Sequence, residues 1–600
     1  MINQLTHDLT RTHAPYWRDF ACLTLLFGLL YFFQLGDSPL ANPDEARYGE
    51  IAREMVASGD YVLPRLNGVL YFEKPPLLYW MEAGFLKAFG AAENALRAGP
   101  ALFALAGLLL TYTTARHIYG RLAGLTAALV LGTSLLYFAL ARILLIDMAV
   151  SVLMSATLCC FILGVRELPG GRRRWLFYGM YASAALATLT KGLIGFLVTG
   201  AVMFLWLLIC NQWRRLRPFY LPSGAGLFLA IAAPWHILAA QHNDLWANFY
   251  FVHEHWARFT TTVHGRYQPW WYFIPIVFGG LFPWMGFIWP ALQTNLTGGW
   301  VRRQVNWEAW FFAIWAAFIL LFFSLSQSKL IPYILPILLP LAILVGQWLA
   351  GIIKEDARPR LRVGLGIFAT VATALALAIG YVVLNRGSAR NTAQIDVLRG
   401  DGLCIALALL IGASLVLWSW RKKTALTTLM IMGGTALVMY LALAHSQDKI
   451  SRPSTVDLAA RFTAQAKPGD RIYHYREYFH DFSFYAQREV GVVGNAGEIE
   501  LALDPEARAS GRFINEIEFR QQWQGPGRIW AVARKRDTTE LFADSSFHYY
   551  LLERNNSHYL FSNQPSNTCA LAPLTGRTPP PPPSSRLRSS ALSPFHTAYY

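Results

Sequence analysis

The chain has 600 residues, of which 54% are hydrophobic, and its mean hydropathy is +0.32. Apolar windows of about 18 or more residues follow one another along most of it, which excludes a soluble globular protein and predicts a polytopic α-helical membrane protein. Lysine and arginine exceed aspartate and glutamate by 16. The basic residues form short clusters beside the apolar windows, so membrane topology explains the excess and no nucleic-acid partner is expected.

The apolar windows predict about thirteen membrane-spanning helices. Their approximate ranges are 18–36, 96–116, 122–140, 147–165, 174–190, 192–210, 223–240, 270–293, 308–325, 330–350, 362–384, 402–420 and 424–445. Alternate connections carry the arginine and lysine clusters, and the positive-inside rule therefore makes those connections cytoplasmic. The first outer loop (37–95), the second large outer loop (241–269) and the chain after residue 445 are then expected to face outward.

The first outer loop is dense in charged and aromatic residues. Asn42 is suited to cap a helix and Pro43 to occupy its first position, which places Asp44 in the first turn, where the helix dipole favours an ionised carboxylate. Tyr48 follows on the same face, and Gly59 is suited to end the helix. The pattern predicts an amphipathic helix that lies along the membrane surface.

A second surface helix is expected later in the same loop. Glu73 and Lys74 come directly before Pro75-Pro76, which hold Lys74 extended and suit the start of a helix that runs to about Phe89. An acid, a base and a helix start are thus neighbours in sequence. Two interpretations remain open: an interfacial linker whose charges are simply solvated, or part of a site that binds a phosphate.

Three further ionisable residues lie at the outer ends of spans. Asp147 follows Arg142 across a short break, and the two could form a structural salt bridge. Lys191 lies in a very short turn between two spans, where it either reaches the interface or meets a lipid phosphate. Lys329 precedes a proline-rich segment with Tyr333 one turn deeper, and its charge on the outer side calls for a negative partner.

The second large outer loop combines cationic and aromatic residues. Arg258 is suited to hold a phosphate as a planar fork, and Tyr267 lies nearby in sequence. His255 together with Glu73 offers an imidazole and a carboxylate, which suit a divalent metal such as zinc. Two ligands this far apart in sequence leave open whether a metal is bound, and no other cofactor is expected.

Four of these segments resemble one family. They are Asn-Pro-Asp-Glu-Ala-Arg-Tyr from Asn42, Phe-Glu-Lys-Pro-Pro-Leu from Phe72, His-x-x-Arg-Phe from His255 and Ser-Lys-Leu-x-x-Tyr-x-Leu-Pro from Ser328. They are similar to segments of the lipid A 4-amino-4-deoxy-L-arabinose transferases, which belong to the protein O-mannosyltransferase-like glycosyltransferases of the GT-C fold. The resemblance covers most of the first 450 residues.

The resemblance implies a reaction and its place in the cell. An aminosugar, 4-amino-4-deoxy-L-arabinose, would pass from undecaprenyl phosphate to a phosphate of lipid A, with inversion at the anomeric carbon. The enzyme would be a multi-pass protein of the bacterial inner membrane with its active site facing the periplasm. The product would lower the negative charge of the cell surface and give resistance to polymyxin and other cationic peptides.

The residues and the resemblance together assign roles. The expected catalytic residues are Asp44, Asp147 and Glu73. The expected ligands of the lipid phosphate and sugar are Arg47, Tyr48, Tyr71, Lys74, Arg258, Tyr267, Lys329 and Tyr333. Because a phosphate monoester is already largely ionised at neutral pH, Asp44 would matter for positioning, or for balancing the amine of the sugar, more than for removing a proton. A hydroxyl acceptor would instead need a base.

The chain is expected to divide into three parts. Residues 1–445 form the transmembrane glycosyltransferase domain, and residues 446–563 a small periplasmic α/β domain, since the runs RIYHYREY, REVGVVG and GRIWAVAR are strand-like. Residues 564–600 contain five consecutive prolines and are expected to be disordered or artefactual. Three alternatives to the main function stay open: a transferase that uses polyprenyl-phosphate mannose to modify proteins or glycans, a lipid-linked-sugar flippase or transporter, and a non-catalytic lipid-binding protein.

Overall fold

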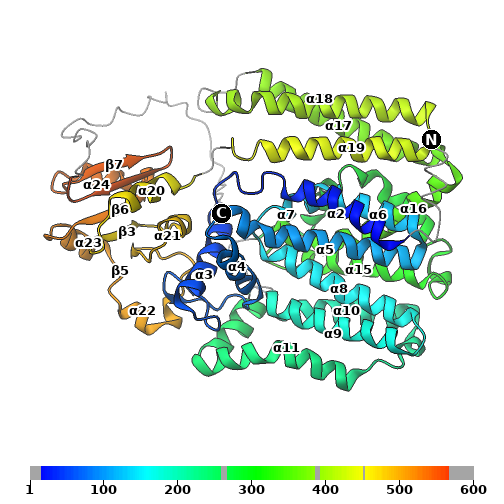
Figure 1. Ribbon diagram of the computed structural model, residues 1–600, viewed down its shortest axis with the longest axis horizontal. Helices are drawn as coiled ribbons and strands as arrows, with labels where there is room; N and C mark the ends of the chain where they lie inside the picture. The colour runs from blue at the N-terminus through cyan, green and yellow to red at the C-terminus, as the bar shows by residue number, and fades with distance from the viewer. Residues whose placement is uncertain (1–14, 258–266, 386–391, 451–452, 566–600) are drawn as a thin grey trace, which may run out of the picture.

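The computed structural model describes residues 15–257, 267–385, 392–450 and 453–565. A bundle of long helices occupies one side of the molecule, and a smaller domain with a β-sheet lies beside one end of it (Figure 1). The helices α3 and α4 of the first outer loop lie between these two parts. The tail predicted to be disordered falls almost wholly outside the described residues.

A helix or a bent pair of helices lies at each of the expected spans. In chain order they are α2 (Tyr16–Phe32), α5 (Glu93–Tyr119), α6 (Arg121–Gly132) with α7 (Leu135–Ala141), α8 (Ile146–Arg166), α9 (Gly171–Lys191), α10 (Ile194–Cys210), α11 (Leu221–His242), α13 (Phe273–Gly280) with η3 (Trp284–Phe287) and α14 (Ile288–Asn295), α15 (Trp307–Leu325), η5 (Ile331–Ile337) with α16 (Leu338–Glu355), α17 (Arg362–Leu384), α18 (Thr392–Lys422) and α19 (Ala425–His445).

The polytopic membrane architecture is confirmed, but the count of thirteen spans is not. Within the described ranges, eight helices are long and apolar enough to cross a membrane, and two bent pairs raise the number to ten. The remaining segments are short or charged. Both α2 and α10 have 17 residues, and α9 begins with three arginines. The proline-rich segment after Lys329 starts as the 3₁₀ helix η5, as its prolines predict.

The basic connections contact one another at the end of the bundle away from the sheet. Arg173 donates to the backbone carbonyl of Arg215, 2.6 Å away, and Arg358 to that of Lys423, 2.7 Å away. These contacts join four of the segments whose charges predicted a cytoplasmic position. The first outer loop, by contrast, packs against the sheet domain at the other end (Figure 1).

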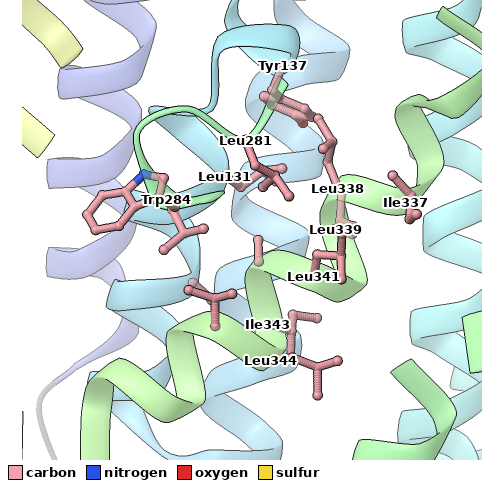
Figure 2. Packing of buried hydrophobic residues seen from close by; sticks show 14 of the residues in the cluster. Leu131, Tyr137, Leu281, Trp284, Ile337, Leu338, Leu339, Leu341, Ile343 and Leu344 are labelled. Carbon is pink, nitrogen blue, oxygen red and sulfur yellow. The ribbon is translucent and has the colours of Figure 1, made fainter. Parts of the chain in front are cut away.

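The bundle is held by a continuous apolar core. Figure 2 shows Leu131 of α6, Trp284 of η3 and Leu338 of α16, which all belong to this core. Gly346 allows α16 to approach α6 closely, because a Cβ there would lie only 2.4 Å from the backbone nitrogen of Ala127. The core fixes the helices whose outer ends carry the ionisable residues.

The C-terminal domain is a mixed α/β unit. Its elements are α20 (Val456–Gln465), β3 (Arg471–Tyr475), α21 (His480–Ala486), β4 (Gly491–Val493), η7 (Leu501–Leu503), α22 (Pro505–Ala509), β5 (Phe513–Ile514), α23 (Glu516–Trp523), β6 (Ile529–Arg534), η8 (Lys535–Thr538), α24 (Thr539–Ala543), β7 (Tyr550–Arg554) and β8 (His558–Ser562). The sheet order is β5-β4-β3-β6-β8-β7; the first four strands are parallel and the last two antiparallel. Strands β3, β4 and β6 are the three predicted strand-like runs.

The two helices of the first outer loop form as predicted, with one correction. They are α3 (Asp44–Ser58) and α4 (Leu77–Phe89), joined through the hairpin β1 (Arg65–Leu66) and β2 (Val69–Leu70). Gly59 ends α3 in the left-handed conformation, with φ at 73°. The predicted cap was wrong: Pro43 occupies the N-cap position, and the Asn42 side chain instead accepts a hydrogen bond from the backbone of Asp481 in α21.

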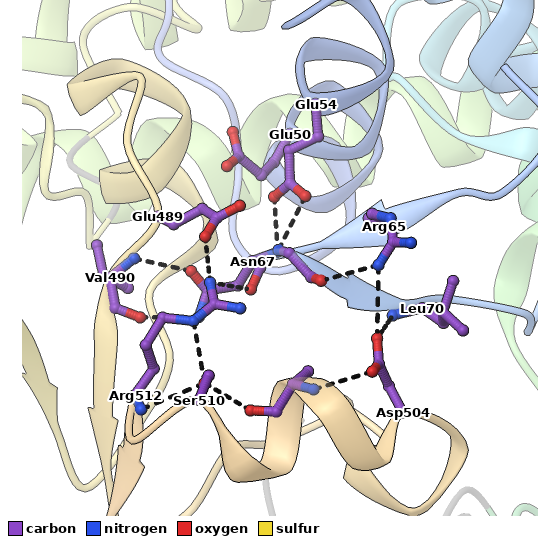
Figure 3. Close-up of polar contacts among 12 residues, drawn as sticks. Glu50, Glu54, Arg65, Asn67, Leu70, Glu489, Val490, Asp504, Ser510 and Arg512 are labelled. Atoms are coloured by element: carbon purple, nitrogen blue, oxygen red, sulfur yellow. Dashed lines mark hydrogen bonds and ion pairs between the residues drawn. The ribbon is translucent and has the colours of Figure 1, made fainter. Parts of the chain in front are cut away.

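A polar network joins this loop to the C-terminal domain (Figure 3). Glu54 of α3 accepts hydrogen bonds from the backbone N–H groups of Asn67 (2.6 Å) and Gly68 (2.9 Å) in the hairpin. The side chain of Asn67 in turn bonds both backbone groups of Val490, and Arg512 donates to the Asn67 carbonyl. Because α3 also packs on α4 and α21, most of its length is buried.

Candidate functional site

A cavity of about 520 Å³ lies at the outer ends of α9, α10 and α15. Its charged lining residues are Glu73 and Lys74 from the first outer loop, Lys191 from the end of α9, and Glu254 from the π-helix η2 (Asn248–Ala257). The rest of the lining is mainly apolar and comes mostly from α10 and α15. A ligand with an ionic head and a hydrocarbon chain matches this division.

Lys74 lies between two carboxylates in the cavity lining. Its Nζ is 2.9 Å from Oε2 of Glu254 and 3.6 Å from Oε2 of Glu73. The Lys74 side chain is 11% exposed and is one of the residues that line the cavity. Most of the side chain is therefore buried. The two prolines that follow fix the backbone here and start α4, as the sequence predicted. Lys74 and Glu73 therefore lie together in the cavity wall.

Asp147 and Lys191 form the second buried ion pair of the site. Asp147 is in the first turn of α8, and its carboxylate accepts a hydrogen bond from the Lys191 ammonium. That ammonium lies over the ring of Tyr333, 4.4 Å from its centroid. The salt bridge considered between Arg142 and Asp147 is wrong, because Arg142 donates to backbone carbonyls of the α2 end, including Tyr31 and Phe33.

Asp44 faces Arg47 at the start of α3, outside the residues that line the cavity. Arg47 Nη2 donates to Asp44 Oδ1 over 2.5 Å, and the Asp44 side chain is 45% exposed. Arg47 also forms an ion pair with Glu498 of the C-terminal domain and lies 5.2 Å from the centroid of the Tyr48 ring.

Several other predicted site residues are close enough to Arg47 to affect its pKa. Although burial favours loss of its proton, the neighbouring groups raise the pKa of Arg47, Tyr71 foremost and Tyr48, Asp44 and Glu73 after it. Burial also raises the pKa values of the Tyr48 and Tyr71 hydroxyls. Both phenols therefore stay neutral and keep an O–H that a ligand could accept from. Asp44, Arg47, Tyr48 and Tyr71 form one cluster that adjoins the cavity through Glu73.

Lys329 lies in the segment between α15 and η5 and is held by backbone carbonyls. Its ammonium donates to Ser326 (2.5 Å) and Gln268 (2.8 Å) and lies 5.8 Å from the ring centroid of Tyr267. Burial lowers the pKa of Lys329. Ser326 and Ser328 border the cavity, so Lys329 lies behind this wall, close to it but not among the residues that line it.

Two predicted residues fall outside what the structure describes. Arg258 lies in the segment 258–266, and the side chain of His255 is likewise outside the described part of the chain. Among the described residues no group of three or more potential metal ligands is found. Glu73 alone remains of the predicted zinc pair, whereas a protein zinc site usually has at least three protein ligands. The described residues thus do not fit a zinc site, and the metal stays a prediction.

Two acids that the fold brings to the predicted cations were not predicted from the sequence. Glu254 is 180 residues from Lys74 in sequence, and Glu498 is far from Arg47. For Glu254 a signal was present: it is an acidic residue between two histidines in a loop that was singled out for its positive charge. Glu498 carried no signal, because its loop lies in a domain in which no catalytic pattern was found.

Comparison with known proteins gives related sequences for the transmembrane part. A family model described as dolichyl-phosphate-mannose-protein mannosyltransferase matches residues 73–238. An undecaprenyl phosphate-alpha-4-amino-4-deoxy-L-arabinose arabinosyl transferase of Edwardsiella ictaluri is 32% identical over 363 residues, 59% of this chain and 65% of the relative. A protein of the same name from Erwinia tasmaniensis is 32% identical over 375 residues, 60% of this chain and 66% of the relative. The chain thus spans just under two thirds of these relatives.

Solved structures extend the likeness over nearly the whole chain. ArnT from Cupriavidus metallidurans, bound to undecaprenyl phosphate, has a TM-score of 0.80 and 27% identity, covering 91% of this chain and 98% of that one. Its apo structure has a TM-score of 0.77 and 28% identity. Coverage of this extent takes in the C-terminal α/β domain as well as the helices. The predicted GT-C membrane fold is therefore confirmed.

Proposed function

We infer that the chain belongs to the family of the undecaprenyl phosphate–aminoarabinose arabinosyl transferases, and we propose that it transfers 4-amino-4-deoxy-L-arabinose from undecaprenyl phosphate to a phosphate of lipid A. The observation that carries the proposal is the cavity, whose lining includes the cations Lys74 and Lys191 and is otherwise mainly apolar. A polyprenyl phosphate needs cations for its head and apolar contacts for its chain. We place this site on the periplasmic face of the bacterial inner membrane.

The proposed reaction is a single displacement at the anomeric carbon. An oxygen of the acceptor phosphate attacks that carbon, a new C–O bond forms, and the bond to the undecaprenyl phosphate oxygen breaks with inversion. The electron pair of the broken bond stays on the leaving phosphate. Lys74 lies where it can stabilise that negative charge, and Arg258 and Lys329 are the further cations that we assign to it.

Asp44 is proposed to position the reactants. It is bonded to Arg47, and the charge of Arg47 is also stabilised by Glu73, which lines the cavity. An acceptor phosphate arrives largely ionised, so little is gained from a base. Appreciable transfer to lipid A by Asp44→Asn would support positioning; complete loss, with Asp44→Glu active, would support proton removal.

One assay tests the proposed function against its alternatives. Membranes that contain the protein are given undecaprenyl phosphate–aminoarabinose and lipid A, and the mass of lipid A is measured. An increase by one aminoarabinose is expected, and its absence overturns the proposal. The same membranes given polyprenyl-phosphate mannose with a protein acceptor test the mannosyltransferase alternative. Movement of a fluorescent donor across vesicles without acceptor tests the flippase.

In cells, the proposed product lowers the negative charge of the surface. We therefore expect polymyxin resistance from a plasmid that carries the wild-type chain in a host without its own transferase, and none from one that carries Lys74→Ala. A divalent metal at Glu73 and His255 is tested separately by the metal content of the purified protein. No step above depends on that metal.

A further inference from the structure

One turn of the C-terminal domain contacts both outer loops that supply charged residues to the cavity. It consists of Leu503 and Asp504, between η7 and α22, and is called the 503–504 turn below. Both of its residues are buried. None of the residues assigned to the reaction above belongs to the C-terminal domain, so these contacts raise the question of what the domain contributes.

Asp504 holds the first outer loop. Its Oδ2 accepts a hydrogen bond from the backbone N–H of Leu70 over 3.1 Å and lies 3.5 Å from Nη1 of Arg65 (Figure 3). Its other carboxylate oxygen accepts from the backbone N–H of Ala507 over 2.9 Å and caps α22. Leu70 is the last residue of β2, and Lys74 follows it by only four residues. Asp504 therefore fixes the strand that leads into the cavity lining.

Leu503 holds the described part of the second outer loop. Asn243, which follows the last residue of α11, donates from its Nδ2 to the backbone carbonyl of Leu503 over 2.8 Å. The Leu503 side chain belongs to a buried apolar cluster that includes Trp246 and Tyr250. Tyr250 lies on η2, four residues before Glu254, which lines the cavity. Leu503 thus fixes the segment that leads to the other side of the Lys74 contact.

We propose that the 503–504 turn is a clamp that positions the two outer loops for binding of the lipid-linked phosphate. Lys74 comes from one loop and Glu254 from the other, 180 residues away in sequence, so their place in one cavity depends on how the loops are held. A buried turn bonded to both loops fixes this arrangement before the ligand arrives, and less conformational entropy is then lost on binding. The assignment rests on the proposed function and adds to it a positioning role for the C-terminal domain.

Two substitutions test the clamp, because each releases one loop. Asn243→Asp keeps the shape of the side chain but replaces the donor to Leu503 by a carboxylate oxygen. Asp504→Ser keeps a helix cap for α22, but the shorter side chain does not reach Leu70. Each variant should bind undecaprenyl phosphate about five- to tenfold more weakly than the wild type, because the binding-competent arrangement is less populated. The KM for the donor should rise equally, while kcat should change by less than about twofold, since a bound donor restores the arrangement.

The double variant Asn243→Asp/Asp504→Ser shows whether the two contacts act through one turn. Once either loop is released, the remaining contact no longer fixes the loops relative to each other. The double variant should therefore bind undecaprenyl phosphate at most about twofold more weakly than the weaker single variant. Independent contacts would instead multiply their effects, to about 25- to 100-fold, and that result would overturn the proposal.

Asn555→Asp is the matched control. The Asn555 side chain also donates to a distant backbone carbonyl, that of Ser454 (2.6 Å), and accepts from the N–H two residues on, as Asn243 does. Its partners lie within the C-terminal domain, so its loss should lower the Tm and leave the binding of undecaprenyl phosphate unchanged. If Asn243→Asp behaved in the same way, the turn would serve stability alone and the proposal would be overturned.

The proposed function fails in a distinguishable way. A wild-type protein that binds undecaprenyl phosphate but transfers no aminoarabinose to lipid A would contradict the proposed function. The ratios of the dissociation constants among the wild type, the two single variants and the double variant would still decide whether the 503–504 turn is a clamp.

Discussion

Two groups of buried acids lie within the same outer region of the protein and differ in how their charge is balanced. At the cavity, Glu254 and Asp147 each accept a hydrogen bond from a lysine, Lys74 and Lys191. At the contact with the C-terminal domain, Glu50 and Glu54 lie four residues apart on α3. Arg53 bonds Glu50, whereas Glu54 bonds the backbone of the hairpin.

The two arrangements have different chemical consequences. Burial, and after it the neighbouring Glu50 carboxyl, raises the pKa of Glu54 to about 8. The interface thus responds to protons. At the cavity each carboxylate is paired with a lysine ammonium, which an anionic ligand would also attract. Buried carboxylates paired with lysines are therefore suited to a ligand site. Buried carboxylates that lie close to each other instead make a contact whose stability depends on pH.

The largest effect is expected from removing a cavity cation. Lys74→Ala should lower transfer at least about 100-fold, because the leaving phosphate loses a charge that stabilises it in the transition state. The measurement is the initial rate of lipid A modification at saturating donor. Lys87→Ala is the control, since Lys87 is an exposed lysine of α4 that lies over the ring of Tyr61. Half or more of the wild-type rate in Lys74→Ala would contradict the assignment.

A smaller effect, on stability as well as activity, is expected at the second cavity pair. Asp147→Asn leaves the ammonium of Lys191 buried without its carboxylate, and removing one partner of such a pair costs roughly 3 kcal/mol. The two side chains are only 10% and 15% exposed, so solvent screens the pair weakly. The apparent Tm of the purified protein in detergent should therefore fall.

The double variant Asp147→Asn/Lys191→Met separates the contribution of the ion pair to stability from its contribution to transfer. It removes both charges, so its Tm should return most of the way to that of the wild type, while transfer stays low. If the double variant is as unstable as the single one, the ion pair is not what Asp147 contributes to stability.

Local patterns were sufficient to predict the helices α3 and α4, but not the hairpin between them. Gly59 and the two prolines before Leu77 set the end of α3 and the start of α4, because their backbone preferences act within a few residues. The apolar windows placed the helices, and the three strand-like runs became β3, β4 and β6. Lys74 was predicted as a site residue and does line the cavity, because the two prolines that follow it fix its backbone.

Partners that come from distant segments were not predictable in the same way. Asp147 had a nearby candidate in Arg142, yet its partner is Lys191, which the packing of α8 on α9 brings to it. The side chain of Asn42 was expected to cap α3. It instead accepts a hydrogen bond from the backbone N–H of Asp481 in α21, more than 400 residues away in sequence. The count of thirteen spans stays unconfirmed for another reason: even with each bent pair counted as one span, α2 and α10 are short and α9 carries three arginines in its first turn.

The smallest effect is expected at the α3 interface, where it appears as a pH dependence. The pKa of Glu54 is raised from 4.5 to about 8 in the folded protein. A carboxyl with a raised folded pKa contributes stability that is fully present below its unfolded pKa and is lost as the pH rises through about 8. The apparent Tm of the wild type should thus decline between pH 5 and pH 8–9 by about 1–2 °C more than that of Glu54→Gln, which cannot ionise.

The groups that face Glu54 decide how this experiment is controlled. Glu50 and Arg53 lie on α3 itself, and Glu489 and Tyr478 approach from the C-terminal domain. Replacing Glu54 by Gln shifts the Tm at every pH, because one of the two backbone N–H bonds is lost, so only the slope against pH is diagnostic. Glu506→Gln, on the exposed side of α22, should keep the wild-type slope. Parallel curves for the wild type and Glu54→Gln would mean that the proton is held elsewhere, and hydrogen exchange at the Asn67 and Gly68 amides would then show no change in protection near pH 8.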